Sequence, residues 1–306
     1  MTFSALLTTF ANNLLPVLLI GGAGFFLGKI LEIEPRTLGR VVFYLFSPLL
    51  VFNLLLKSQL DFGEALGTLG FALIVMLSLS ILALLLGKAI GLDRPHILVM
   101  LLIATFGNNG NYGLPLISFA FGEEALAHAT IYFVVMAILI NTGGVLIASL
   151  GHADLRTALL GLFKIPTVYG VLLAGLLNLL NFELPVPLSR TIDLAAGATI
   201  PIMLVMLGLE LTRTQWSHDW RALGLGVFLR LIAGPVIALL LAGLFGLQGP
   251  ARQSNIVQAG MPAAVTTAVL ATEYHLEPEL TTAIIMISTV LSPLTLTPLL
   301  VYLGGN

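Results

Sequence analysis

Long apolar segments alternate with short polar ones along the whole chain. A helix needs about 20 predominantly apolar residues to cross the roughly 30 Å hydrocarbon core of a bilayer, and ten segments of this sequence are suited to that. They cover residues 12–31, 38–56, 66–90, 96–121, 125–150, 159–180, 188–210, 222–247, 253–274 and 280–303. The longest polar stretches lie around Glu32–Arg40, Gly151–Thr157 and Thr212–Arg221. We therefore predict an all-α membrane protein with ten transmembrane helices.

The fourth and ninth segments are interrupted by residues that disfavour a helix. Thr105–Ile117 reads TFGNNGNYGLPLI, so three asparagines, three glycines and a proline lie inside an apolar run. Gln258–Thr267 reads QAGMPAAVTT. Unwound backbone that faces lipid costs several kcal/mol per unsatisfied group, so such breaks occur where they line a cavity or pack in protein. We predict two broken helices that cross near the membrane midplane.

The two halves of the chain repeat one proline pattern. Pro16 (LLPVLL) and Pro166 (KIPTVY) lie near the starts of the first and sixth segments. Pro48 (FSPLLV) and Pro201 (TIPIML) lie within the second and seventh. Because each half has five segments, homologous halves must cross the membrane in opposite orientations. We predict two inverted repeats, residues 1–150 and 151–306.

Paired breaks in inverted halves are the best sequence indication of a transporter binding site. The N-terminal ends of half-helices attract anions, and side-chain amides both donate and accept hydrogen bonds. We predict that the breaks hold a carboxylate, with Pro115 and Pro262 keeping the backbone unwound. Asn141, in the fifth segment, suits a structural contact between helices equally well. The candidate substrate-binding residues are Asn108, Asn109, Asn111, Tyr112, Pro115, Asn141, Gln258, Pro262, Thr266 and Thr267.

One cation lies deep in an apolar segment. Arg230 is about eight residues into the eighth segment, or roughly 12 Å from its end. It can extend along the helix to the membrane interface, or it can serve as a counter-charge for an anionic substrate or a carboxylate. Neither break contains a carboxylate. We therefore expect flux driven by the membrane potential or the substrate gradient, without an acidic sodium or proton site.

Composition excludes several other classes of function. The chain is 58% hydrophobic and 9% charged, whereas a soluble domain is about a quarter charged. Its net charge of −2 argues against nucleic-acid binding. The five histidines show no H-E-x-x-H spacing, and no pair of deep acidic residues could form a catalytic dyad. We expect no enzyme activity, no metal site and no cofactor. A channel stays open as an alternative, because broken helices also line pores.

The distribution of Lys and Arg predicts the orientation. One side carries nine of them: Lys29, Arg36, Arg40, Lys88, Arg94, Arg156, Lys164, Arg213 and Arg221. The other side carries three, which are Lys57, Arg190 and Arg252. The side with more Lys and Arg is normally cytoplasmic. We expect a multi-pass protein of a bacterial inner membrane with both termini outside.

Three stretches resemble the auxin efflux carrier family, which includes the plant PIN-FORMED proteins and many bacterial transporters. They are FSPLLVFNLL in the second segment, GNNGNYGLPL in the fourth and MPAAVTTAVLATEY in the ninth. The resemblance implies ten spans in two inverted repeats, a fold shared with bile acid sodium symporters and sodium/proton antiporters. It also implies a scaffold of spans 1, 2, 6 and 7 (about 12–56 and 159–210), through which homodimers form. Spans 3–5 and 8–10 (about 66–150 and 222–303) would be a transport domain that moves like an elevator.

The sequence departs from the plant members of that family in places. Thr267 stands where many of them have a second proline, and Ala198 and Thr199 stand near a position where they have asparagine. Their long cytoplasmic loop is reduced here to about Gly151–Leu160. We predict a secondary carrier for a small organic anion, a carboxylate or an auxin-like acid. The alternatives are an ion- or solute-conducting channel and a sodium- or proton-coupled symporter of the same fold.

Overall fold

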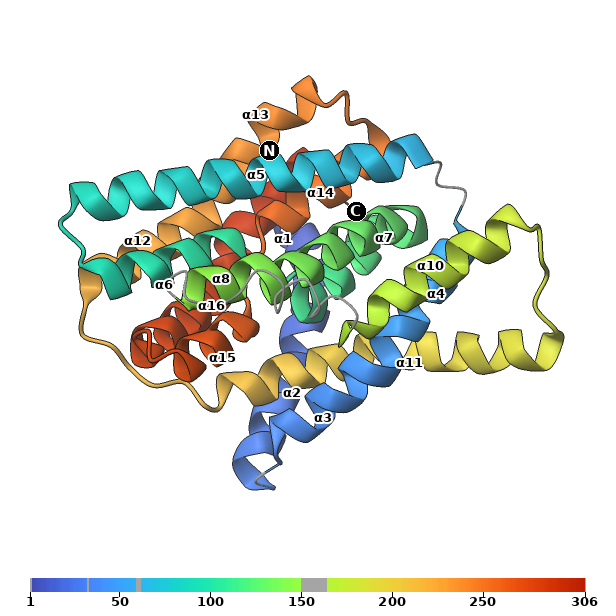
Figure 1. Ribbon diagram of the computed structural model, residues 1–306, viewed down its shortest axis with the longest axis horizontal. Coiled ribbons are helices and arrows are strands. Elements are labelled where there is room, and N and C mark those ends of the chain that lie inside the picture. Colours follow the sequence, from blue (N-terminus) through green and yellow to red (C-terminus); the bar gives the residue numbers. More distant parts are fainter. Residues whose placement is uncertain (1, 32, 59–61, 150–163, 306) are drawn as a thin grey trace.

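The computed structural model describes residues 2–31, 33–58, 62–149 and 164–305, which are almost entirely helical (Figure 1). The loop Gly151–Leu160, the start of the sixth predicted span and the boundary between the repeats lie outside these residues. The helices of the first half are α1 Phe3–Thr9, α2 Leu15–Ile30, α3 Pro35–Val41, α4 Ser47–Lys57, α5 Phe62–Ala89, α6 Arg94–Thr105, α7 Leu114–Leu139 and α8 Val145–Ala148. Those of the second half are α10 Pro166–Leu179, α11 Val186–Leu211, α12 Trp220–Phe228, α13 Gly234–Leu244, α14 Gly249–Ala259, α15 Val265–Glu273 and α16 Pro278–Tyr302.

Seven helical segments within the described residues are long and apolar enough to cross a membrane: Phe3–Ile30, Pro35–Lys57, Gly63–Ala89, Asn109–Ala148, Val186–Leu211, Trp220–Leu244 and Pro278–Tyr302. The fourth and ninth predicted spans are each divided into shorter helices, α6 with the start of α7 and α14 with α15. The fifth span continues from α7 beyond Gly122, where φ is +77° and only glycine is unstrained. The protein is therefore a helical multi-pass membrane protein, and the number ten stays a prediction.

Wide π-helical turns precede four prolines. These turns are η1 Phe10–Leu14, η2 Val42–Phe46, η3 Asn109–Gly113 and η6 Leu229–Ala233. In each case a proline stands two residues beyond the turn, at Pro16, Pro48, Pro115 and Pro235. A proline ring clashes with the carbonyl four residues earlier, and it offers no N–H to bond there. Widening the turn relieves that clash, so these prolines bend membrane helices without ending them.

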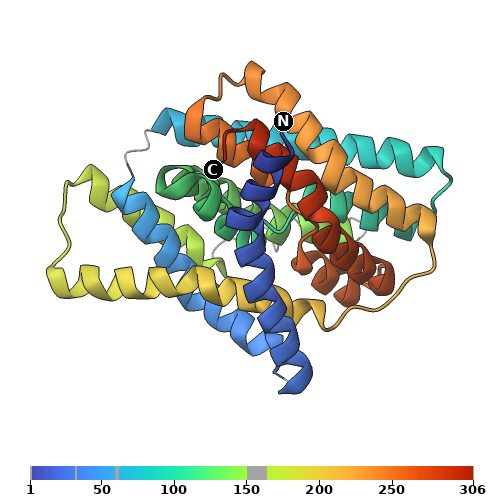
Figure 2. The same cartoon turned by 180° about the vertical axis from the view of Figure 1, so that it is seen from behind.

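The helices pack in two groups. In one group, α2, α3 and α4 pack against α11, and α10 packs against α4; in the other, α5–α8 pack with α12–α16 (Figures 1 and 2). In the first group, a Cβ at Gly24 would overlap the backbone of Val205, and one at Gly208 would overlap the backbone of Gly21. Gly24 of α2 and Gly208 of α11 therefore allow these two helices of the same chain to pack closely.

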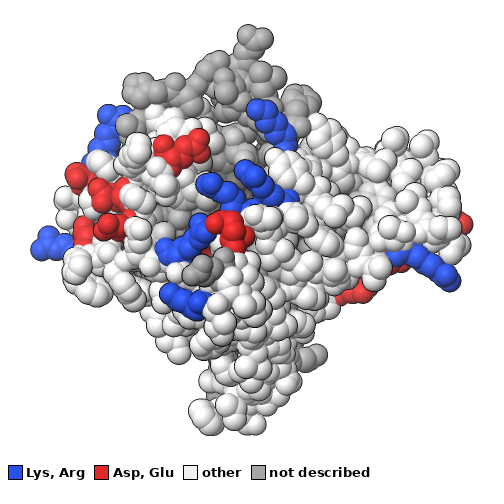
Figure 3. Space-filling view, turned by 90° about the horizontal axis from the view of Figure 1, so that it is seen from below, with Lys and Arg blue, Asp and Glu red and all other residues white. Residues whose placement is uncertain are grey.

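Most of the exposed surface is apolar. Large side chains with more than half of their surface exposed include Leu19, Phe26, Leu172, Leu194 and Leu240, which lie on four different helices. Figure 3 shows most of the charged side chains gathered on one half of the face and a smaller group near the opposite edge, with wide areas that carry none. An apolar surface of this extent needs lipid around it.

Candidate functional site

The two helix breaks lie against each other. The backbone N–H of Asn108 donates to the carbonyl of Pro262 at 2.7 Å, and the N–H of Ala264 donates to the carbonyl of Phe106 at 3.0 Å. Gly107 and Ala263 lie between these bonds as an isolated antiparallel bridge. Each break thus satisfies backbone groups that the other leaves without helical partners, which is what unwound backbone within a membrane requires.

Asn109 and Gln258 join the start of one half-helix to the end of another. The Nδ2 of Asn109 donates to the backbone carbonyl of Gln258 at 2.8 Å and to its Oε1 at 2.7 Å. The Nε2 of Gln258 donates to the carbonyls of Asn109 at 3.2 Å and Ala129 at 3.1 Å. Both side chains are buried. Their donors are therefore engaged within the protein, which suits holding the breaks together better than contacting a substrate.

Arg230 extends from the π turn of α12–α13 to the C-terminal ends of α6 and α14. Its guanidinium donates to the carbonyl of Ala104 at 2.9 Å, to Ala259 at 3.3 Å, and to Met261 at 2.9 and 2.6 Å. The side chain is only 2% exposed. Arg230 thus lies inside the protein at the breaks and does not extend to an interface.

Other amides beside the first break remain available. The Nδ2 of Asn108 is buried and has no hydrogen-bond partner among the described residues. Asn111 is half-buried, and its Nδ2 lies 3.4 Å from Oε2 of Glu210 in the last turn of α11. The first N–H groups of a helix have no intrahelical partner. The N–H of Asn109 donates to the carbonyl of Gly107 at 2.8 Å, so backbone donors beside these amides would come from the residues of η3 that follow it. A carboxylate group could accept hydrogen bonds from this set.

The remaining predicted residues are distributed unevenly. Pro115 is buried at the start of α7, and the hydroxyl of Tyr112 accepts from Ser292 of α16 at 2.9 Å. Thr266 is exposed at the start of α15, while the Oγ1 of buried Thr267 donates to the carbonyl of Ala264 at 2.6 Å. The amide of Asn141 is exposed and donates to Ala137 of its own helix at 2.7 Å. Asn141 thus lies outside both breaks, and its described hydrogen bond stays within its own helix.

Sequence reasoning missed three neighbours of the breaks. Glu210 ends a span, which is a position typical of interfacial side chains, yet it faces Asn111. Ser288 accepts a hydrogen bond from the N–H of Ala263 at 3.2 Å, and Ser292 contacts Tyr112. Ser288 and Ser292 are four residues apart, so a helix presents both on one face. That spacing of small polar residues in the last span was the signal that could have found them.

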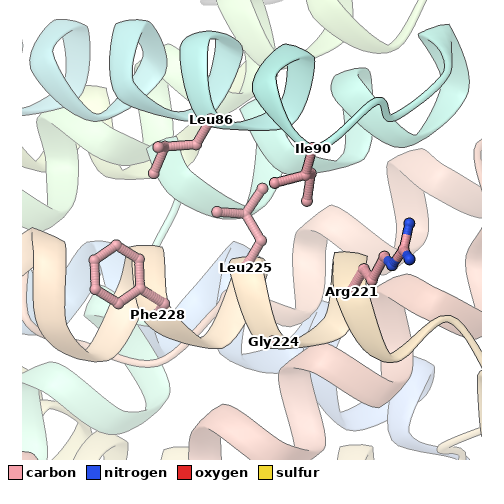
Figure 4. Close-up of a pocket in the computed structure, with 6 residues that line it drawn as sticks. All are labelled: Leu86, Ile90, Arg221, Gly224, Leu225 and Phe228. Atoms are coloured by element: carbon pink, nitrogen blue, oxygen red, sulfur yellow. The ribbon is translucent and has the colours of Figure 1, made fainter.

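A cavity of about 550 Å³ lies elsewhere, between α5 and α12. Its lining is Leu86, Ile90, Arg221, Gly224, Leu225 and Phe228, so none of it comes from the breaks. Figure 4 shows Leu86 and Ile90 pointing from α5 toward Leu225, with Arg221 at one end. This mostly apolar groove offers few polar groups to fix a carboxylate, whereas the breaks gather several. We therefore take the breaks as the candidate site.

Comparison with known proteins gives matches along nearly the whole chain. A family described as membrane transport protein matches residues 9–300. An uncharacterized transporter of Methanothermobacter thermautotrophicus is 27% identical over 286 residues, which is 93% of this chain and 94% of that protein. A Rhizobium meliloti protein whose name assigns it provisionally to malonate transport is 30% identical over 64% of this chain and 63% of its own. Auxin efflux carrier component 6 of Arabidopsis thaliana is 26% identical over 43% of this chain and 24% of its own.

Proposed function

The chain belongs to the family of membrane transport proteins, and we propose that it is a secondary carrier that moves a small organic carboxylate across the membrane. The resemblance to auxin efflux carriers is confirmed, since two relatives bear that name. Relatives named for auxin and for malonate both point to acids that carry a carboxylate. We infer that this group is the part of the substrate that the breaks recognise.

The observation that carries this proposal is the buried Nδ2 of Asn108, at the N-cap of η3, which has no hydrogen-bond partner among the described residues. A buried amide without a partner costs about 1–3 kcal/mol, which a ligand that accepts from it would recover. The amide of Asn111 and the N–H groups at the start of η3 lie next to it, and helix N-termini favour anions. We therefore propose that the substrate carboxylate binds at the start of η3, with the rest of the molecule directed toward Glu210 and α11.

The two packing groups support an elevator mechanism. We propose that α2–α4, α10 and α11 form the scaffold, and that α5–α8 and α12–α16 form a transport domain that carries both breaks. In this scheme the chain has ten spans in two inverted repeats, and the broken spans cross as the backbone bridge between Gly107 and Ala263 suggests. The scaffold would also form a homodimer.

The contact between Asn111 and Glu210 supports an inward-facing state. Glu210 lies three residues before Arg213, and Arg213 donates to Glu34 at 2.7 Å. Lys29, Arg36, Arg40 and Arg213 are among the cations that the sequence predicts on the cytoplasmic side. We propose that the candidate site is at the cytoplasmic end of α11 in this structure, in an inner membrane with both termini outside.

A test of the function is substrate-induced current from proteoliposomes, with malonate, other aliphatic dicarboxylates and aromatic acetic acids as the panel. We expect a saturable transient current for one or two acids and its loss in Asn108→Ala. Because the Nδ2 of Asn108 has no partner among the described residues, that variant should fold normally. Asn178→Ala removes an amide from α10, where it donates to Leu55, and should keep the current.

The outcomes separate the alternatives. Single-channel steps in planar bilayers would indicate a channel. A current that requires sodium or a proton gradient would indicate a coupled symporter. Silence across the whole panel, from protein shown to be folded, would contradict transport of organic anions.

A further inference from the structure

Two half-helices end beside each other within the protein. α6 ends at Thr105 and α14 ends at Ala259. The last carbonyls of a helix have no intrahelical partner, and each helix end carries about half a negative charge. In transporters with broken helices, such ends form the place where a coupling cation is held. The backbone carbonyls at the ends of α6 and α14 therefore form a cation-binding site without any acidic side chain.

The Arg230 guanidinium occupies that cation-binding site. Its guanidinium donates to one carbonyl from the end of α6, Ala104, and to two from the end of α14 and the second break, Ala259 and Met261. No described carboxylate lies within ion-pair distance of Arg230, so its charge is matched by the two helix ends. Guanidinium is planar with donors in a fixed fork, and it stays charged where an ammonium would lose its proton.

The first break is shaped around this guanidinium. A Cβ at Gly107 would overlap the Nη2 of Arg230. Gly107 has no positive φ that would demand glycine, so the close approach of the guanidinium is the reason for a glycine at this position. The sequence thus provides both the cation, Arg230, and the glycine, Gly107, that leaves space for its guanidinium.

We infer that Arg230 is a built-in cation, which takes the place of a coupling ion at the ends of α6 and α14 and positions the two breaks for substrate. This inference rests on the proposed carrier function. It predicts that the wild-type protein transports carboxylate equally well when sodium is replaced by choline. It also predicts equal transport at several pH values, provided that the pH is the same on both sides of the membrane.

The test uses the full-length Arg230→Ala protein and small cations added to it. We expect the initial rate of carboxylate uptake to fall on the order of 100-fold, because misplacing a site by about 1 Å can cost that much. Millimolar guanidinium should restore uptake and raise the midpoint of thermal unfolding in detergent. Urea, which has the same planar shape without the charge, should restore neither. Arg221→Ala, which removes an exposed arginine of α12, is the matched control and should respond to neither compound.

Two results would overturn the inference. One is rescue by urea equal to rescue by guanidinium, since the charge would then be irrelevant. The other is wild-type uptake that stops without sodium. If Arg230→Ala does not fold, Arg230→Lys provides the same test. One ammonium cannot reach all three carbonyls, so the thermal unfolding midpoint of this variant should still rise with guanidinium. The unfolding midpoint can be measured without substrate. A wild-type protein that transports no carboxylate would therefore refute the proposed function, while the cation-binding site at the ends of α6 and α14 could still be tested by the unfolding midpoint.

Discussion

Asn109 donates both hydrogens of its side-chain amide to Gln258, one to the backbone carbonyl and one to Oε1. The two residues are 149 positions apart and belong to different halves of the chain. One stands at the start of a half-helix and the other near the end of the opposing one. This pair therefore fixes the two breaks to each other beside the backbone bridge, and it should behave as one energetic unit.

Single and double substitutions of this pair should be strongly non-additive. Asn109→Ala and Gln258→Ala each leave buried polar groups without partners, so each should reduce the free energy of unfolding by about 1–3 kcal/mol. The double variant should lose less than the sum, since the groups stranded by one change are removed by the other. Reversible unfolding in mixed micelles measures the cycle. Losses that simply add would show that the pair is not a unit.

Gly107→Ala should disturb the breaks without removing any charge. The added methyl group would overlap the Arg230 guanidinium, so the guanidinium must leave at least one carbonyl. Overpacking of this kind costs about 1–3 kcal/mol. Gly67→Ala on α5, where a Cβ meets nothing within 4 Å, is the control. Equal thermal midpoints for the two variants would refute the close approach.

Gly24→Ala should loosen the contact between α2 and α11. A Cβ at Gly24 meets the backbone of Val205, which cannot move aside as a flexible side chain would. We expect a loss of about 1–3 kcal/mol in the free energy of unfolding. Gly22→Ala lies two residues away on the same helix and faces open space, so it should change little. The two variants are compared by thermal unfolding in the same detergent.

Acid should weaken the contact between the start of α3 and the end of α11. The side-chain hydrogen bond from Arg213 lowers the pKa of Glu34 below its usual 4.5. A carboxyl with a lowered pKa stabilises the folded state above its ordinary pKa, and this contribution is lost as pH falls through the lowered pKa. Wild type should therefore lose slightly more thermal stability in acid than Glu34→Gln. The effect is small because both side chains are exposed, and parallel acid profiles would contradict it.

The breaks themselves could be predicted because their cause is local. Gly107, Gly110 and Pro115 stand close together in an apolar run, and residues of that kind interrupt a helix wherever it lies. The partners of the break residues could not be predicted, since they depend on contacts between distant segments. Arg230 and Ala104 are 126 positions apart, and nothing in either segment specifies the other.

The direction of single side chains was also beyond the sequence. Asn141 falls in the π turn η4 Ile140–Gly144, where the extra residue per turn shifts the helical register. The α-helical period of 3.6 residues then no longer predicts the direction of the Asn141 side chain. Glu210 is a second example: it stands in the last turn of α11, where interfacial side chains are common, but its contact with Asn111 comes from how α11 packs on η3.

Protection of a single cysteine by substrate tests most directly whether the breaks hold the carboxylate. The chain contains no cysteine, so Glu210→Cys places the one thiol of the protein beside Asn111, and Thr37→Cys at an exposed site on α3 is the control. We predict that carboxylates which produce a transport current slow maleimide labelling at position 210, in proportion to their affinity, and leave position 37 unchanged. Labelling at position 210 that no transported carboxylate slows would contradict a substrate site at the breaks.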